Sequence, residues 1–369
     1  MREAINDRSQ SKVLILRALP WGADSRALRW ATIYSPRPIR WGCWGTHAAQ
    51  HRDEVILRWR PSAGYMNFVI GYVAFIVMSL FYALKHLRRG DILLCIDLET
   101  ALPGIIAAKL RGAKIHYDMA DPFFLVKPVP FKQFWRKLEA WFLRQADLAT
   151  APHESRFGLF FAKPPSHARV VENVPDICRA RLRSQFRPLR EGRRSLTLGY
   201  FGTLDHHRGI EDILAFVEDH PDIQLKIGGR GVLQSLVVEA TYRCDRIQFV
   251  GAYRPDDLGA LTQDVDVYCS LYYCSKPLHR FAAPNKYYEH LALGIPILMS
   301  ANTPYASDVL KNGTGWVIED GRDVLERWYA LVKDDVDSFE RCSKRARDLW
   351  KALYADWLPH QQNFFDNFG

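Results

Sequence analysis

The chain has 369 residues, of which 48% are hydrophobic and 25% charged. This length and composition predict a globular protein of two domains and exclude a disordered or fibrous chain. The seven cysteines form no CxxC pair and no cluster with histidines, so we expect reduced thiols in a cytoplasmic protein rather than disulfides or a zinc site. Charged residues are scattered through the first 12 positions, a pattern that does not fit a secretory signal.

Positive charge is concentrated in the first half of the chain. Residues 1–180 hold 26 Lys and Arg against 15 Asp and Glu, whereas the remainder holds 24 against 26. No compact basic helix, RNP-type aromatic motif or zinc pattern accompanies this excess, so we do not expect nucleic acid as a partner. An anionic membrane surface is the expected partner, because each well-placed cation contributes about 1 kcal/mol there.

Alternating strands and helices predict that the first half is one parallel α/β unit. A helix with Pro103 in its first turn is expected between the second and third of the strands. Strands are predicted at 12–19, 91–97, 113–119, 148–152 and 168–174.

An uncharged stretch of twenty residues, Tyr65 to Leu84, lies between Arg60 and Lys85. Its length would suit a transmembrane helix. A true span would put the two halves of one sheet on opposite sides of a bilayer. We therefore expect a helix that is partly buried in the unit and partly dipped into the membrane interface, with a span and a re-entrant anchor as the alternatives.

Two carboxylates follow the strand at 113–119 and are candidates for the catalytic centre. Asp118 and Asp121 should both point toward a cleft at the carboxyl end of the sheet, with His116 on the same strand face as Asp118. Capping of a helix by Asp121, ahead of Pro122, is an equally plausible role. The end of the preceding strand supplies second-rank acceptor-site candidates, Asp97 and Glu99.

The second half begins after a polar, Arg-rich linker at 182–195 and predicts a second doubly wound sheet. The segment 196–217 is expected to form an apolar strand, a Gly-containing turn and an amphipathic helix, and further strands are expected at 225–231, ending in glycines, 247–253 and 265–271. Gly199 and Gly202 allow the backbone to pass close to a ligand. Arg208 precedes the first helix of this half, where a diphosphate would meet both cations and N–H groups.

The segment Pro284 to Pro296 reads as a turn, a helix and a turn before an apolar strand. The N–H groups at Asn285 to Tyr287 and the Lys286 cation would bind an anion at the helix start. Glu289, one turn further on, would repel a phosphate but accept hydrogen bonds from ribose hydroxyls. The alternative is an ordinary turn with one exposed Glu.

The motifs GYFGTL, RGIEDIL, IGGRG, FVGAY and PNKYYEHLALGIPIL resemble, in this order, the C-terminal domain of retaining glycosyltransferases of family 4. The resemblance is strong from about 195 to 335 and weaker upstream. It implies an α/β protein of GT-B fold: two doubly wound Rossmann-like domains face each other across a cleft, and the C-terminal helix crosses back to the N-terminal domain. The implied parts are a membrane-facing acceptor domain, a linker, a nucleotide-sugar domain and a final helix, at 1–181, 182–195, 196–345 and 346–369.

The resemblance also implies roles for individual residues. The catalytic set is Asp118, Asp121, Arg208 and Lys286. The donor-binding set is Gly202, Thr203, Arg208, Gly229, Arg230, Tyr253, Asn285, Lys286, Tyr287 and Glu289. Three positions depart from the family: Thr203 replaces a common Arg, Phe281 replaces the first of two glutamates, and Ala120 stands where related enzymes often have a His.

The function implied by the resemblance is transfer of a hexose, with retention, from a nucleotide diphosphate sugar, UDP rather than GDP. The acceptor is expected to be a lipid-linked saccharide in surface polysaccharide synthesis, at the inner face of the cell membrane. No metal and no cofactor beyond the donor are expected. The alternatives are a soluble transferase that acts on a small acceptor and a non-catalytic GT-B partner subunit.

Overall fold

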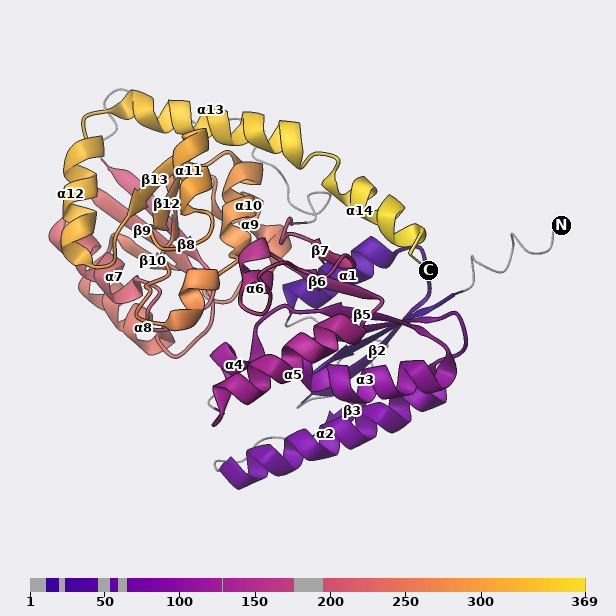
Figure 1. Ribbon diagram of the computed structural model, residues 1–369. Helices are drawn as coiled ribbons and strands as arrows, with labels where there is room; N and C mark the ends of the chain where they lie inside the picture. Colours follow the sequence, from indigo (N-terminus) through magenta and orange to yellow (C-terminus); the bar gives the residue numbers. More distant parts are fainter. Residues whose placement is uncertain are drawn as a thin grey trace. The chain divides into compact units, whose positions relative to one another are not determined.

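The computed structural model describes residues 11–19, 24–45, 54–58, 65–127, 129–175 and 195–368. The chain divides into an N-terminal unit, residues 1–172 with 358–369, and a C-terminal unit, residues 173–357. Each unit is a parallel sheet covered by helices (Figure 1), as predicted. The predicted linker at 182–195 lies, except for its last residue, outside the described part of the chain.

The N-terminal unit is built on a seven-stranded sheet in the order β3-β2-β1-β4-β5-β6-β7, with every neighbouring pair parallel. Its strands are β1 (Val13–Arg17), β2 (Ile39–Gly45), β3 (Glu54–Arg58), β4 (Ile92–Ile96), β5 (Lys114–Asp118), β6 (Leu148–Ala151) and β7 (Ala168–Val170). Its helices are α1 (Ser25–Tyr34), α2 (Tyr65–His86), α3 (Leu98–Arg111), α4 (Phe123–Val126), α5 (Lys132–Gln145), α6 (Glu154–Gly158) and α14 (Trp357–Asp366). Sequence analysis predicted the central strands but not β2 and β3.

Strands β1 and β4 pair at the centre of this sheet, and all their residues are buried. They read as continuous apolar runs, VLILR and ILLCI, because helices cover both of their faces. Helix α3 lies close to β4 at Gly104, where an added Cβ would be 2.2 Å from the Cys95 Sγ.

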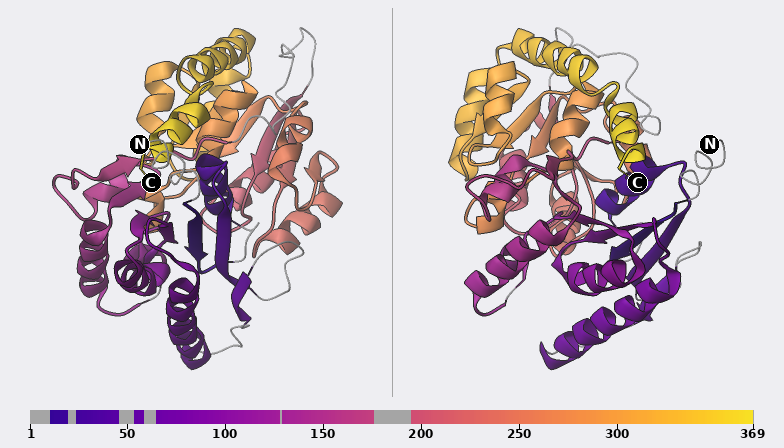
Figure 2. Two further views of the ribbon diagram at one scale, coloured as in Figure 1. Left: turned by 90° about the vertical axis from the view of Figure 1, so that its right-hand side faces the viewer. Right: turned by 45° about the vertical axis from the view of Figure 1, so that its right-hand side comes forward.

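Helices α2, α3 and α5 cover one face of the sheet, and α1 and α14 cover the other (Figures 1 and 2). Right-handed crossovers from β3 to β4, β4 to β5 and β5 to β6 require the first three helices to share a face. Phe365 of α14 is fully buried, with its ring centroid 5.1 Å from Trp30, 5.3 Å from Tyr34 and 5.5 Å from His116. The final helix therefore packs on the N-terminal unit, as predicted.

The segment just before that helix differs from the prediction. Helix α13 (Val336–Leu353) belongs to the C-terminal unit, where its Ala346 and Trp350 are buried. Only residues 358–369 join the N-terminal unit, so the part that packs back begins about twelve residues later than the expected 346.

The C-terminal unit contains a six-stranded parallel sheet in the order β10-β9-β8-β11-β12-β13. Its strands are β8 (Leu196–Phe201), β9 (Ile223–Gly228), β10 (Ile247–Phe249), β11 (Val267–Ser270), β12 (Ile297–Ser300) and β13 (Gly315–Ile318). Its helices, besides α13, are α7 (Ile210–Asp219), α8 (Gln234–Arg243), α9 (Leu258–Leu261), α10 (Asn285–Leu293), α11 (Ala306–Asn312) and α12 (Arg322–Val332), with short 3₁₀ turns at Pro255–Asp257 and Pro277–Phe281.

Each sheet has a point where the direction of strand order reverses, between β1 and β4 in one unit and between β8 and β11 in the other. Connections leave such a point on opposite faces of the sheet, so the loops part there and open a crevice at the carboxyl ends of the strands. These two switch points are where polar side chains collect in each unit.

Candidate active site

The loops after β8 and β9 pack backbone against backbone at the carboxyl edge of the C-terminal sheet. The N–H of Gly202 donates to the Gly228 carbonyl (3.0 Å), and the N–H of Leu204 donates to the Arg230 carbonyl (2.9 Å). A Cβ added at Gly229 would lie 1.7 Å from the Gly202 carbonyl oxygen. Only glycine fits at position 229, where the backbone of Gly202 passes close to the neighbouring loop. At Gly199, the other glycine predicted to pass close to a ligand, an added Cβ would instead lie 2.6 Å from the Val265 side chain.

Lys286, in the first turn of α10, has a charged side chain that is buried in this region. It is only 5% exposed, and its Nζ has no hydrogen-bond partner among the described residues. The Nζ lies 3.5 Å from the centroid of the Tyr200 ring, and a Cβ at Gly202 would be 3.2 Å from its Cε. Burial, followed by the nearby Arg208 charge, lowers the pKa of Lys286 to about 7. A buried ammonium without partners costs the fold free energy.

Arg208 converges on the same place from the loop before α7. Its guanidinium carbon lies 4.1 Å over the Tyr272 ring, and its Nε is buried without a hydrogen-bond partner. The Lys286 Nζ lies 5.9 Å from the centroid of that same ring. Neither cation forms an ion pair with a carboxylate of the described residues. Aromatic faces hold both charges in place and leave them available to an anion.

His279 contributes a third basic group beside the two cations, but it is neutral. It is 1% exposed and makes an edge contact with Tyr272 at 5.1 Å. Its Nδ1 is 2.8 Å from the Tyr273 carbonyl, which fixes the tautomer with the proton on Nδ1. Burial, followed by the Arg208 charge, lowers the pKa of His279 to about 4.

Glu289 lies one turn further along α10, surrounded by phenols. Its Oε2 accepts a hydrogen bond from the Tyr268 hydroxyl at 2.8 Å. Burial, and then the Glu289 charge, raise the pKa values of Tyr268 and Tyr253, so both stay protonated and can donate. A carboxylate in this setting suits hydroxyl groups better than a phosphate, which agrees with the ribose role predicted for it.

The other predicted donor-binding residues differ in their placement. Thr203 and Arg230 are exposed on the loops after β8 and β9, and Asn285 is the half-buried first residue of α10. The ring of Tyr287 is instead buried and stacked on Tyr305 at 4.3 Å. Its N–H donates to the Pro284 carbonyl at 3.2 Å, which removes it from the free anion donors that were predicted. Phe281 ends the 3₁₀ turn that precedes α10.

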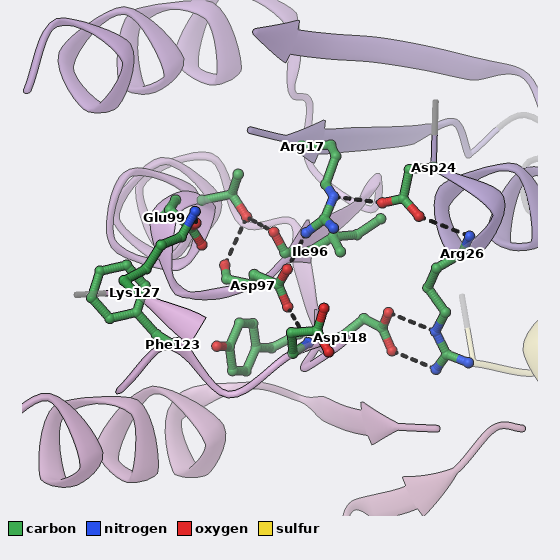
Figure 3. Close-up of polar contacts among 12 residues, drawn as sticks. Arg17, Asp24, Arg26, Ile96, Asp97, Glu99, Asp118, Phe123 and Lys127 are labelled. Carbon is green, nitrogen blue, oxygen red and sulfur yellow. Dashed lines mark hydrogen bonds and ion pairs between the residues drawn. The ribbon is translucent and has the colours of Figure 1, made fainter. Parts of the chain in front are cut away.

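Asp118, a predicted catalytic residue, lies in the core of the N-terminal unit (Figure 3). Arg26 binds it through two hydrogen bonds of 2.7 and 3.0 Å, and the Thr150 hydroxyl donates to it at 2.7 Å. Arg26 lowers the pKa of Asp118 against the opposing effect of burial. This satisfied, fully buried ion pair indicates a structural role for Asp118, whose catalytic role stays a prediction. His116 does share the strand face of Asp118, and its Nε2 is 2.8 Å from the Thr150 hydroxyl.

A chain of ion pairs fills the switch point between β1 and β4 (Figure 3). The Arg17 Nε lies 2.6 Å from a carboxylate oxygen of Asp24, and its Nη1 pairs with Asp97. Asp97 has a left-handed backbone with φ 65°, and its side chain accepts a bond from the Asp121 N–H at 2.9 Å. Burial, reinforced by Glu99, raises the pKa of Asp97 to about 7 against the opposing charge of Arg17.

Asp121 and Glu99 complete this polar region. The Asp121 carboxylate is 47% exposed and pairs with the Arg156 Nη2 at 3.1 Å. It does not cap α4, whose N-terminal cap is Pro122, so the capping alternative is wrong. Glu99 accepts from the Tyr72 hydroxyl at 2.6 Å and pairs with the Lys127 Nζ at 3.2 Å. Within the described residues, no group of three or more His, Cys, Asp or Glu side chains is arranged to hold a metal ion.

Comparison with known proteins places the site in context. The family described as glycosyl transferases group 1 matches residues 183–349, which lie in the C-terminal unit. No curated protein matches the chain.

Solved structures resemble the chain over nearly its whole length. Sucrose-phosphate synthase from Thermosynechococcus elongatus is 14% identical, with a TM-score of 0.72 over 97% of this chain and 99% of that one. Anabaena HepE in complex with UDP and glucose is 16% identical, with a TM-score of 0.71 over 97% and 99%. An E. coli trehalose-6-phosphate protein bound with UDP-2-fluoro glucose is 12% identical, with a TM-score of 0.67 over 97% and 99%. The fold is GT-B, as predicted, and its C-terminal unit carries a glycosyltransferase group 1 domain.

Proposed function

We propose that this protein is a retaining, metal-independent hexosyltransferase of the family 4 type that uses a UDP-sugar donor. The observation that carries the proposal is the Lys286 ammonium. It is buried at the start of α10, and among the residues that the structure describes it has no hydrogen-bond partner and Arg208, which converges on it, has no carboxylate. Two neighbouring cations without a counter-charge cost the fold free energy, which indicates that they are held for function. A bound diphosphate would supply the negative charge that neutralises them.

The transfer step follows from these charges. As the bond between the sugar C1 and the diphosphate oxygen breaks, negative charge grows on the leaving phosphate. Lys286, Arg208 and the N-terminal end of α10 stabilise that charge, each charged hydrogen bond contributing about 1.5–3 kcal/mol. The acceptor hydroxyl oxygen bonds to C1 from the face that the diphosphate leaves, and its proton passes to the leaving phosphate. Glu289 holds the ribose hydroxyls and so positions the donor.

UDP is proposed over GDP because two similar structures contain it. HepE was solved with UDP, with UDP-glucose, and with UDP and glucose, and the E. coli protein with UDP-2-fluoro glucose. These ligands belong to those proteins, whose sequences are only 12–16% identical to this chain. They support the proposal because the two units here match theirs in fold and because Glu289 and the cations suit a ribose and a diphosphate.

The acceptor is proposed to be a lipid-linked saccharide in surface polysaccharide synthesis, reached at the cytoplasmic face of the cell membrane. The cationic excess of residues 1–180 and the apolar helix α2 support this proposal. A small soluble acceptor is the second candidate, because one similar structure is a sucrose-phosphate synthase and another carries the name of trehalose-6-phosphate.

A donor panel tests the proposal. Purified protein is incubated with UDP- and GDP-sugars, with and without a chelator, and with either a lipid-linked saccharide or a sugar phosphate as acceptor. We expect UDP release that depends on the lipid-linked acceptor, survives the chelator and yields a product with the anomeric configuration of the donor, read by NMR. UDP release with the sugar phosphate alone would favour the small acceptor. No release from any donor would favour a non-catalytic subunit, for which Thr203 and Phe281 are the sequence support.

A further inference from the structure

Helix α2 has two apolar sides, and only one of them packs against its own unit. Phe75, Ser79 and Ala83, spaced four residues apart, are fully buried against the sheet. The opposite side exposes large apolar side chains: Ile70 (50%), Val73 (55%), Val77 (47%), Met78 (41%) and Phe81 (66%). The window Val69–His86 is long and apolar enough to cross a membrane, yet only 22% of it is buried.

The neighbouring helices extend this apolar surface. On α3, Leu102, Ile106 and Leu110 are 45, 40 and 70% exposed, and on α5, Phe134 and Trp141 are 58 and 48% exposed. Helices α2, α3 and α5 lie side by side on one face of the sheet in each view (Figures 1 and 2). We call their outward sides the three-helix face. So many large exposed apolar side chains on neighbouring helices are unusual for a soluble protein and indicate an interaction site.

The exposed charges of these three helices all have the same sign. They are Lys85, Lys109, Arg111, Lys132, Arg136, Lys137 and Arg144. The helices contain two carboxylates, Glu99 and Glu139, and both are buried and bonded within the unit, Glu139 to the Tyr117 hydroxyl and the Phe123 N–H. No carboxylate of the three helices therefore offsets the cations on the outside.

Phe131, just before α5, strengthens this pattern. Its backbone is left-handed, with φ 53°, and its ring is 83% exposed. A bulky side chain disfavours that backbone conformation, and an exposed ring gains nothing from folding. An apolar phase outside the protein would bury the ring and offset both costs.

We propose that the three-helix face binds an anionic membrane surface, with its helices lying in the interface rather than across the bilayer. Apolar side chains and cations together supply the two signals that stable peripheral binding needs. The exposed cations, which no carboxylate of the three helices offsets, complement anionic lipid headgroups in charge. A span by α2 does not fit, because Phe75 and Ala83 pack in the core with Leu14 and Leu93, and removing the helix would expose that core to water.

This inference rests on the part of the proposed function that places the acceptor at a membrane. The vesicle assay that tests it requires no nucleotide, so its outcome is independent of the donor chemistry. Full-length protein is sedimented with vesicles of phosphatidylcholine alone or with 30% phosphatidylglycerol, a test composition of roughly the anionic content that attracts basic surfaces. We expect at least tenfold tighter partition to the anionic vesicles at low salt and partial release at high salt. If the wild-type protein stays in solution with anionic vesicles at low salt, the inference is wrong.

Matched variants locate the binding face. The variant V73S/V77S/F81S should lose at least tenfold in partition. The control V232S/L310S/L331S changes apolar residues of the C-terminal unit that are on average more exposed still, and it should bind as the wild type does. Equal binding by both variants would overturn the assignment. A fall in the mass of a wild-type oligomer in the first variant, with vesicle binding unchanged, would show that the face binds another copy of the protein instead.

The cations and one aromatic ring provide two further readouts. Changing Lys132, Arg136 and Lys137 to Gln should weaken partition by about fivefold per cation removed, whereas the same change at Lys311, Lys333 and Lys351 should not. Lipids brominated in the acyl chain should quench tryptophan fluorescence, and much of the quenching should be lost in Trp141→Phe. Quenching that W141F leaves unchanged would contradict insertion of this face. UDP binding unaltered in every face variant would separate this inference from the donor site.

Discussion

The two units place buried or half-buried cations at the switch points of their sheets and treat them in opposite ways. In the N-terminal unit, Arg17 is paired with Asp24 and Asp97, and Arg26 is paired with Asp118. In the C-terminal unit, Lys286 and Arg208 lie over the rings of Tyr200 and Tyr272 and have no carboxylate partner in the described part of the chain.

This difference separates structural charges from charges held for a ligand. A buried ion pair with all its hydrogen bonds made is part of the fold, and breaking it leaves an uncompensated charge. A cation on an aromatic face has no carboxylate that its removal would leave unpaired. Its removal should therefore leave the stability of the fold unchanged and weaken binding of the ligand. The predictions below test this division.

The largest effect is expected in the N-terminal unit. Asp118→Asn removes the carboxylate charge and leaves Arg26 buried without it, which should lower the free energy of unfolding by about 3–5 kcal/mol. Urea unfolding followed by circular dichroism measures the loss. The double variant Arg26→Met/Asp118→Asn should recover part of it, because no charge remains unpaired. A loss below about 1 kcal/mol would place Asp118 outside the structural class and revive its predicted catalytic role.

The opposite sign is expected in the C-terminal unit. Lys286→Met removes a buried cation that has no partner, so the free energy of unfolding should stay the same or rise by about 1–2 kcal/mol. Lys333→Met, at an exposed position, serves as the control for the substitution itself. A clear loss of stability in Lys286→Met alone would mean that this ammonium supports the fold, and the comparison between the units would break down.

A smaller effect is expected from the ring that supports Arg208. Tyr272→Leu removes the aromatic face, so Arg208 loses its anchor and UDP affinity should fall by about 1–2 kcal/mol, which is about five- to thirtyfold. Tyr272→Phe keeps the face and should bind UDP nearly as the wild type does. Uridine affinity should be the same in all three proteins. Equal losses in the Phe and Leu variants would assign the effect to the hydroxyl rather than to the ring.

The smallest expected effect is the uptake of protons when the donor binds. Because the pKa of Lys286 is about 7, most of this side chain is neutral at pH 8 in the free protein. A bound diphosphate favours the charged form and raises that pKa, so UDP-glucose binding should take up a proton at pH 8 and weaken as the pH rises above 7. Calorimetry in two buffers of different ionisation enthalpy measures the uptake, which should vanish in Lys286→Met. Uptake that persists there would point to another group.

The sequence predicted the fold and the positions of the cations well, because both depend on local patterns. Buried parallel strands such as 92–96 read as continuous apolar runs, and a Pro-Asn turn before an amphipathic segment places Lys286 at a helix start. Strand β2, IRWGCWG, was missed because its two glycines interrupt the apolar pattern that marks the other strands.

The partners of those cations could not be predicted, because they depend on contacts between distant segments. Tyr200 was predicted only as part of a strand, and Tyr272 follows the strand predicted at 265–271. Both lie near the carboxyl ends of β8 and β11, beside the switch point, where a ring can support a cation. Arg26 and Asp118 are 92 positions apart, so nothing local marked Asp118 as one half of an ion pair. The exposed apolar side chains of α3 and α5 were not predicted, because only α2 lies in a long apolar stretch without charges.

The central claim is that Lys286 is kept unpaired for the diphosphate of a nucleotide donor, and calorimetric titration with UDP and with uridine tests it most directly. The wild-type protein should bind UDP more tightly than uridine. Lys286→Met should lose about 10- to 100-fold in UDP affinity, the value of one charged hydrogen bond, while its uridine affinity stays unchanged. Equal UDP affinity in the two proteins, or a parallel loss of uridine binding, would contradict the account.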